Sequence, residues 1–250
     1  MRKNASRWPA VLSTALWVFV WQGIAMLVGL PLLLPSPVAT ISAAFQLWGQ
    51  YAFWRSALFS LLRIMGGYLL AIVVGLILAN LCARRKPAEL ILAPLRSVIR
   101  STPVSSFIIL VLLWMKVDAV PVFIAFLMVL PIVWHGMQEG IVALDWQLAE
   151  MASVYDFSLG NRLRHVILPQ LLPLFRSVAA TGSGIAWKAG IAEEVIARPA
   201  FSIGRHLQDT KVYLLTDQLF AWTLTVIVLS VMLERGLKHL FLSAGKEDGA

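Results

Sequence analysis

Residues 145–169 read DWQLAEMASVYDFSLGNRLRHVILP, a polar interlude between two long apolar runs. One set of apolar side chains recurs at the i, i+3, i+4, i+7 spacing of a helix face: Leu148, Met151, Ala152 and Tyr155. Asp145 is a residue type that caps helix N-termini, and a second set with the same spacing follows the turn-like residues 156–158: Leu159, Leu163, Val166 and Ile167. The stretch therefore predicts two short amphipathic helices that contact another protein, followed by an apolar helix that begins near Pro169 and Pro173.

The rest of the chain has the composition of a membrane protein. Of its 250 residues 59% are hydrophobic and only 14% are charged, and the mean hydropathy is +0.80. These values exclude an ordinary soluble domain and predict an all-α polytopic membrane protein in which residues 1–250 form a single domain. Roughly six windows are long enough to cross a bilayer: 11–33, 57–82, 95–115, 119–137, 172–192 and 217–237. A shorter apolar patch, residues 38–51, predicts an interfacial helix outside the membrane.

Basic residues gather on alternate connections between these windows. They are Arg2, Lys3 and Arg7, residues 84–86, Arg162 and Arg164, and Lys238 and Lys246. Because short cytoplasmic loops are rich in lysine and arginine, we expect both termini and the 145–169 loop to face the cytoplasm. The net charge of +8 comes largely from these flanks, so membrane lipids are the expected anionic partner and nucleic acid is not.

Several kinds of catalytic or metal-binding site have no matching pattern in the sequence. There is no Gly-x4-Gly-Lys-Ser/Thr loop to cradle phosphates, so any ATP hydrolysis must come from a partner. There is no Gly-x-Ser-x-Gly elbow either. The lone Cys82 and the four scattered histidines show no metal-ligand spacing, and we expect no metal site.

The polar loop resembles the cytoplasmic loop of the membrane-spanning subunits of bacterial ATP-binding-cassette (ABC) importers. Glu150-Met151-Ala152 matches the core of their EAA signature, and Val166, Leu168 and Pro169 match its aliphatic-x-Leu-Pro ending. Asp156 occupies the position of the family glycine. Aspartate also tolerates a left-handed turn, so we expect the turn to survive the replacement.

Further motifs extend the resemblance over nearly the whole chain. They are similar to patterns in importers for sulfonates, nitrate, taurine and pyrimidine vitamin precursors. In chain order they are residues 34–37 (LPSP), 60–63 (SLLR) with Gly67, 100–103 (RSTP), 131–132 (PI), 187–188 (WK), 193–194 (EE) and 220–223 (FAWT).

The resemblance implies a type I importer permease that couples a partner's ATP hydrolysis to solute movement. It implies two ABC ATPase subunits, which use ATP and Mg²⁺, while this chain binds no cofactor. It also implies a periplasmic or lipid-anchored substrate-binding protein, a homodimer of this chain, and the bacterial cytoplasmic (inner) membrane. The expected ATPase-coupling residues are Leu148, Ala149, Glu150, Met151, Ala152, Tyr155 and Asp156.

Small residues and a few charges suggest how the spans pack and where solute passes. The face Gly67, Ala71, Gly75 and Ala79 of the second span predicts close packing inside the bundle. The fifth span carries two neighbouring stripes of small residues, Ala180, Gly184 and Lys188 on one and Gly182, Ala186 and Gly190 on the other, and because it contains Lys188 we expect this span to form a wall of the translocation path and also to touch a second copy of the chain.

Charges inside spans are expensive, so Lys188 and, more weakly, Arg63 are candidates to attract an anionic solute. A lysine that reaches the outer interface, or that pairs with Glu193 or Glu194, is the alternative. We expect both glutamates and residues 202–205 in an external loop after the fifth span.

Two other classes of membrane protein compete with the importer. An ATP-independent secondary transporter or channel would often show inverted repeats, which we do not find between the two halves. A membrane enzyme would need a catalytic constellation that the sequence lacks. The sequence leaves the identity of the solute open.

Overall fold

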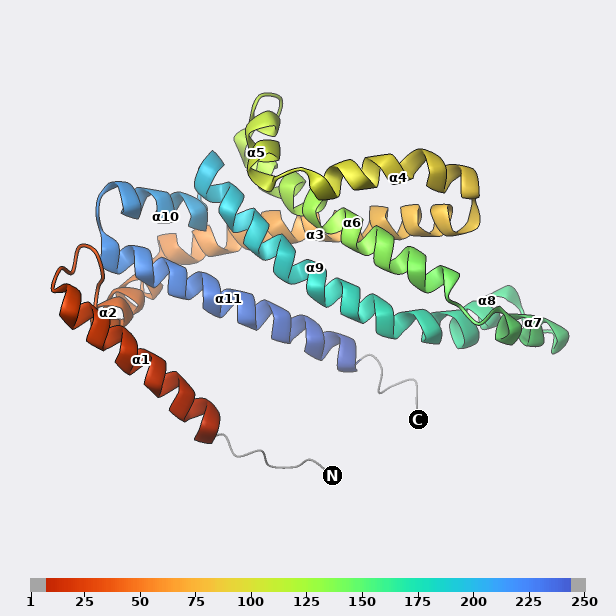
Figure 1. Cartoon of the computed structure of the whole chain (residues 1–250), viewed down its shortest axis with the longest axis horizontal. Helices are drawn as coiled ribbons and strands as arrows, with labels where there is room; N and C mark the ends of the chain where they lie inside the picture. Colours follow the sequence, from red (N-terminus) through yellow and green to blue (C-terminus); the bar gives the residue numbers. More distant parts are fainter. Residues whose placement is uncertain (1–7, 244–250) are drawn as a thin grey trace.

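The computed structural model describes residues 8–243, which are almost entirely helical and contain no strand. The helices are α1 (Trp8–Val28), α2 (Pro37–Trp48), α3 (Tyr51–Arg84), α4 (Lys86–Ser101), α5 (Val104–Leu112), α6 (Val120–Val142), α7 (Trp146–Val154), α8 (Leu159–Arg162), α9 (Leu168–Ala197), α10 (Ile203–Val212) and α11 (Thr216–Ser243). A 3₁₀ turn (Val117–Ala119) precedes α6, and a π-helical turn (Leu163–Ile167) joins α8 to α9. The all-α prediction is confirmed (Figure 1).

Helices α3, α6 and α9 form the centre of the bundle and lie side by side along its long axis (Figure 1). The predicted small face of α3, Gly67, Ala71, Gly75 and Ala79, is buried. A Cβ added to Gly67 would stand 2.1 Å from the Val122 carbonyl oxygen, and one added to Gly75 would stand 2.8 Å from Cγ1 of Val133. Small residues thus let the backbones of α3 and α6 approach closely, as predicted.

Small residues also let α9 pack closely against α6 and α3. A Cβ on Gly182 would lie 3.0 Å from Cγ1 of Val129 on α6, and one on Gly190 would lie 2.5 Å from Cγ1 of Ile64 on α3. Ala186, between them on the same stripe, is fully buried. This stripe of α9 is therefore packing surface inside the bundle.

Within residues 8–243, four helices are long and apolar enough to cross a membrane: Val11–Val28, Tyr51–Arg84, Val117–Val142 and Thr216–Gly236. A fifth crossing is present if the bent pair α4 and α5 counts as one span. The expected span 172–192 lies inside α9, whose 30 residues extend about 45 Å, but α9 is not among the four. The count of six spans is therefore not confirmed.

The expected span over residues 95–115 is not a single straight helix. The chain bends by 99° between α4 and α5. Pro103 has no N–H to continue the helix, and its ring keeps the preceding Thr102 extended, at φ −80° and ψ 129°. As a result α4 ends at Ser101, and α5 leaves the axis of the bundle (Figure 1).

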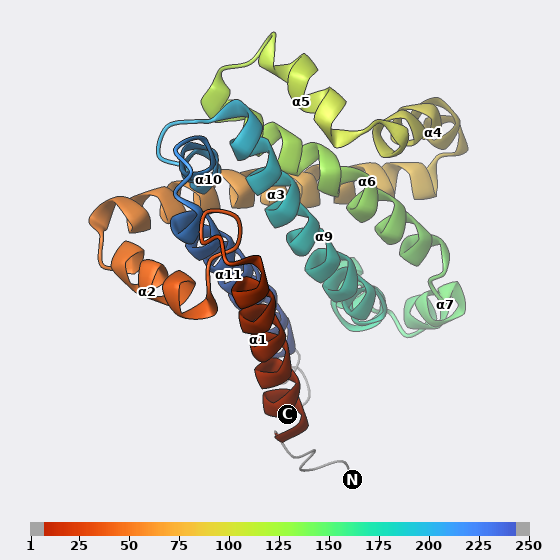
Figure 2. The ribbon, with the colours of Figure 1, turned by 60° about the vertical axis from the view of Figure 1, so that its left-hand side comes forward.

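The two peripheral helices at the N-terminal side rest on α11. Helix α2 matches the predicted short helix, and its Trp48 Nε1 donates to Thr225 Oγ1 on α11 at 3.1 Å. Figure 2 shows α1 beside α11, where Trp21 stacks on Phe220 with ring centroids 5.9 Å apart. The location of α2 outside the membrane stays a prediction.

The expectation that Glu193 and Glu194 lie in an external loop is wrong, because α9 continues through both of them and ends only at the left-handed Arg198. Both glutamates are 0% exposed. Glu194 Oε2 accepts hydrogen bonds from Ser60 Oγ at 2.7 Å and from the Gly204 N–H at 3.2 Å. Helix α10 folds back over this end of α9, so the carboxylate ties α3, α9 and α10 together.

Candidate functional site

The predicted contact helix is present as α7, at the far end of the molecule from α10 (Figure 1). Asp145 caps it as expected: its Oδ1 accepts from the N–H groups of Gln147 at 3.0 Å and Leu148 at 3.4 Å. The Asp145 N–H donates to Gln170 Oε1 at 3.0 Å, which anchors the start of the loop to α9. Local capping thus defines the helix, and one side-chain bridge fixes its position on the bundle.

The predicted left-handed turn after α7 is also present. Asp156 has φ 56°, and the Phe157 N–H donates to the Ala152 carbonyl at 3.0 Å, which closes the helix end. Ser158 then caps α8 by accepting from the Asn161 N–H at 3.3 Å. The second loop helix differs from its prediction, because the four residues of α8 pass through the π turn directly into α9. The apolar pattern of residues 159–167 therefore continues without a break into α9, which begins at Leu168.

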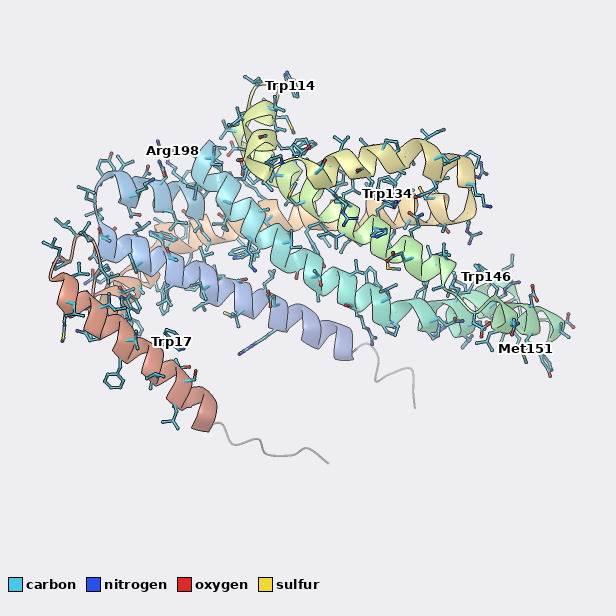
Figure 3. All side chains as sticks on the ribbon, viewed as in Figure 1. Trp17, Trp114, Trp134, Trp146, Met151 and Arg198 are labelled. Carbon is cyan, nitrogen blue, oxygen red and sulfur yellow. The ribbon has the colours of Figure 1, made fainter. Side chains whose placement is uncertain are left out.

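Most of the apolar face of α7 is exposed. Leu148 is 47% exposed, Met151 55% and Tyr155 73%, whereas Ala152 is buried at 7%. Glu150 and Asp156 are exposed polar residues beside this face, and the Ala149 backbone lies in α7. Figure 3 shows Trp146 and Met151 at the tip of the molecule, away from the bundle. The loop therefore presents apolar side chains that the described chain leaves uncovered, and three of them were not predicted: Trp146, Val154 and Phe157.

A second polar feature is a groove of about 310 Å³ between α9 and α11. Its lining residues are Ala180, Thr181, Gly184, Ile185, Lys188 and Glu234. The predicted wall stripe of α9 therefore does border open space. The carboxylate of Glu234 lies over Gly184, since a Cβ there would stand 3.0 Å from Glu234 Oε1. Among the described side chains Lys188 and Glu234 do not form an ion pair, so each charge is available in the groove.

Comparison with known protein families shows to which family the chain belongs. Residues 71–241 match the family described as "Binding-protein-dependent transport system inner membrane component". The chain belongs to this family. The match includes α7, the left-handed turn and both walls of the Lys188 groove.

Curated relatives resemble this permease along most of its length. The putative aliphatic sulfonates transport permease protein SsuC of Bacillus subtilis (strain 168) is 28% identical over 223 residues, which cover 88% of this chain and 80% of the relative. The taurine transport system permease protein TauC of Escherichia coli (strain K12) is 24% identical over 253 residues, 96% of this chain and 92% of the relative. A second SsuC, from E. coli, is 30% identical over 207 residues, 80% and 76% of the two chains.

These matches establish the class of this permease. It is a translocation subunit of a binding-protein-dependent ABC importer and not an ATPase, and it is a membrane protein whose family resides in the inner membrane. Membership in the family implies ATPase and binding-protein partners. The sequence-based identification of an importer permease is confirmed.

Arg63, the weaker candidate for the pathway, lies at the α10 end of the permease. Its Nη2 donates to Asp118 Oδ1 at 2.7 Å and to the Ala200 carbonyl at 2.9 Å, and its Nη1 lies 4.0 Å from Glu194 Oε1. These contacts join α3 to the turn before α6 and to the connection after α9. A role for Arg63 in solute passage stays a prediction.

The three predicted pathway residues therefore do not form one site. Gly184 and Lys188 line the same groove, whereas Arg63 does not line it and is bonded to Asp118 and the Ala200 carbonyl. Sequence reasoning missed Glu234, the group opposite Gly184. Its signal was present, because Glu234 and Arg235 interrupt the apolar window 217–237. A charge inside a span should have been treated as a candidate site residue.

Proposed function

We propose that α7 is the coupling helix of this permease, and that each of two ATPase subunits grips one such helix in a surface groove. The observation that carries the proposal is the exposed apolar face of α7, with Leu148, Met151 and Tyr155 uncovered. An amphipathic helix that lays such anchors into a groove is a common way of docking. Ala149, Glu150, Ala152 and Asp156 complete the coupling segment within the 145–169 loop of the single 1–250 domain.

ATP and Mg²⁺ belong to the partner in this proposal, and the permease itself holds no cofactor. Two ATPase subunits require two membrane subunits, and a homodimer of this chain supplies both. The termini and the 145–169 loop face the cytoplasm, in keeping with the basic residues that flank them. A substrate-binding protein, periplasmic or lipid-anchored, docks on the opposite face.

The solute we propose is small and anionic. Relatives are named for aliphatic sulfonates and for taurine, both of which carry a sulfonate. The Lys188 groove, with Gly184 in its wall, supports passage of an anion because an unpaired ammonium faces open space there. ATP-dependent closure of the two ATPases would switch the dimer between inward and outward openings.

Gentle purification of the permease from its native membranes tests this assembly. We expect an ATPase to co-elute in equal number with the permease, and its activity to rise when the binding protein and solute are added. Elution of the permease without an ATPase, together with solute movement in vesicles that lack ATP, would contradict the proposal and favour a secondary transporter or channel.

Lys188→Met tests the groove. The substitution keeps the apolar stem and removes the charge, so we expect uptake by vesicles that contain the complete transporter to fall at least about tenfold, the effect of losing one charged contact. Co-elution with the ATPase should persist. Uptake by Lys188→Met at the normal rate would remove Lys188 from the pathway.

A further inference from the structure

A second basic groove lies on α4, where the helix breaks. It has a volume of about 420 Å³ and is lined by Ala93, Arg96, Ser97, Arg100 and Ser101. None of these residues is among the predicted pathway residues. The lining combines two guanidinium groups with two hydroxyl groups, and both kinds of group donate hydrogen bonds to oxyanions. The Ser101 hydroxyl already donates to the Val98 carbonyl at 3.2 Å, so Ser97 supplies the hydroxyl donor of the groove.

The two arginines differ in how far their charge is already balanced. Arg96 donates to Glu89 Oε1 at 2.9 Å and to Gln138 Oε1 at 2.7 Å, so its charge is paired inside the bundle. Arg100 is exposed and makes no hydrogen bond or ion pair with any of residues 8–243. Arg100 therefore supplies the uncompensated positive charge of the groove.

The position of Arg100 along the bundle indicates what surrounds its charge. The Arg96 guanidinium stands 5.2 Å from the Trp134 ring centroid of α6, and α4 and α6 run in opposite directions (Figure 1). One turn further along α4, Arg100 lies level with the middle of the 23-residue helix α6, one of the four apolar helices. A charged side chain at such a depth faces a water-filled cavity or a partner, and Arg100 has no partner.

The backbone beside Arg100 leads to the same conclusion. Thr102 and Pro103 are not helical, and they lie at the same depth as the groove. Irregular backbone at membrane depth occurs only where it is buried in protein or lines an aqueous cavity. The positive charge of Arg100 also interacts favourably with the negative C-terminal end of the α4 dipole. That interaction alone does not explain why a groove with two serines lies beside the charge. Transporters commonly place solute sites at such broken helices.

We propose that the groove at the break of α4 is an anion-binding station on the translocation path, where Arg100 and Ser97 hold the oxyanion group of a passing solute and Ser101 lines the wall. The proposal rests on the proposed function, since it assumes that solute moves along this chain. It adds a site that is separate from the Lys188 groove. It also specifies the chemistry of the solute as an oxyanion rather than a cation or a neutral molecule.

Thiol labelling tests the station without knowledge of the natural solute. The experiment uses the full-length chain in native-membrane vesicles, with Cys82 replaced by serine to remove the natural thiol. A cysteine is then introduced at Ser101, or at Val98 as the control. Val98 lies on the same helix and is 57% exposed but does not line the groove. Each variant is treated from both membrane sides with two methanethiosulfonates, one carrying a sulfonate and the other a trimethylammonium group.

We expect Ser101→Cys to react with both reagents and Val98→Cys with neither. Adding Arg100→Gln should lower the ratio of the sulfonate rate to the trimethylammonium rate at position 101 by about tenfold, whereas Arg100→Lys should preserve it. Excess inorganic sulfate should slow the reaction of the sulfonate reagent with Ser101→Cys when Arg100 is retained. The lysine variant also shows that a change at this position leaves the protein folded.

Three results would overturn the proposal: no reaction at position 101, equal reaction at position 98, or a rate ratio that does not respond to Arg100→Gln. The labelling requires no ATPase and no binding protein. Its failure is therefore distinguishable from failure of the proposed coupling, which the co-elution experiment measures.

Discussion

Replacing Gly67 with alanine is expected to destabilise this permease more than any other single methyl group added to α3. The new Cβ would stand 2.1 Å from the Val122 carbonyl oxygen and 3.0 Å from both Cβ of Ala125 and the Phe126 nitrogen. Because two of these three atoms belong to the backbone of α6, no rotamer change relieves the clash. Overpacking of a core typically costs about 1–3 kcal/mol, and we expect a cost at the upper end or beyond.

The measurement is the apparent melting temperature of the purified permease in detergent, which should fall by about 5 °C or more. Gly66→Ala is the matched control, since the next residue along the same helix has nothing within 4 Å of an added Cβ. Alanine is the better helix former by about 1 kcal/mol, so the control should melt at the same temperature or slightly higher. Equal melting of the two variants would mean that α3 and α6 do not pack as closely as described.

The coupling loop could be predicted because its signals are local. Asp145 caps a helix through N–H groups two and three residues away, and Asp156 makes its turn through its own φ. The resemblance to importer permeases began from the same short segment, and motifs along the rest of the chain extended it. Periodicity could not show that the apolar face of α7 is exposed, because a helix that packs on its own bundle has the same pattern. In the structure only Ala152 of this face is buried, while Leu148, Met151 and Tyr155 are exposed.

The break in the span 95–115 was missed for a different reason. Hydropathy averaged over a window of about 20 residues does not register a single backbone constraint. The proline at 103 and its effect on Thr102 were visible in the sequence, and they outweighed the apolar composition.

The burial of Glu193 and Glu194 could not be predicted from the sequence, because it depends on contacts between distant parts of the chain. Two adjacent carboxylates after an apolar run indicate the end of a span, and the prediction ended the helix there. The partners of Glu194 lie far away in the chain, since Ser60 is 134 residues from it, whereas neither carboxylate oxygen of Glu193 has a hydrogen-bond partner among the described residues. Only the fold brings the Ser60 hydroxyl and the Gly204 N–H to the Glu194 carboxylate, and buried polar groups are tolerated where such partners exist.

Replacing Met151 with glutamate is expected to uncouple ATP hydrolysis from uptake. Met151 is 55% exposed in the centre of the apolar face of α7, so the change should leave the bundle as stable as before. In the proposed groove of the ATPase, however, it replaces a buried apolar anchor by a charge. Burial of such a side chain contributes about 1.5–3 kcal/mol, which corresponds to a loss of about ten- to a hundredfold in affinity.

Uptake driven by ATP and basal ATP hydrolysis, both measured in vesicles that contain the complete transporter, separate coupling from general damage. Uptake should fall at least about tenfold while the melting temperature of the permease stays unchanged. Gln147→Glu adds the same carboxylate to the first turn of the same helix, where negative charge is favourable, and removes no apolar anchor. Ala152→Asp is less suitable as a test, because Ala152 is buried within the loop and its replacement would disturb α7 itself. If Met151→Glu transports as well as Gln147→Glu does, the exposed face of α7 is not where the ATPase grips.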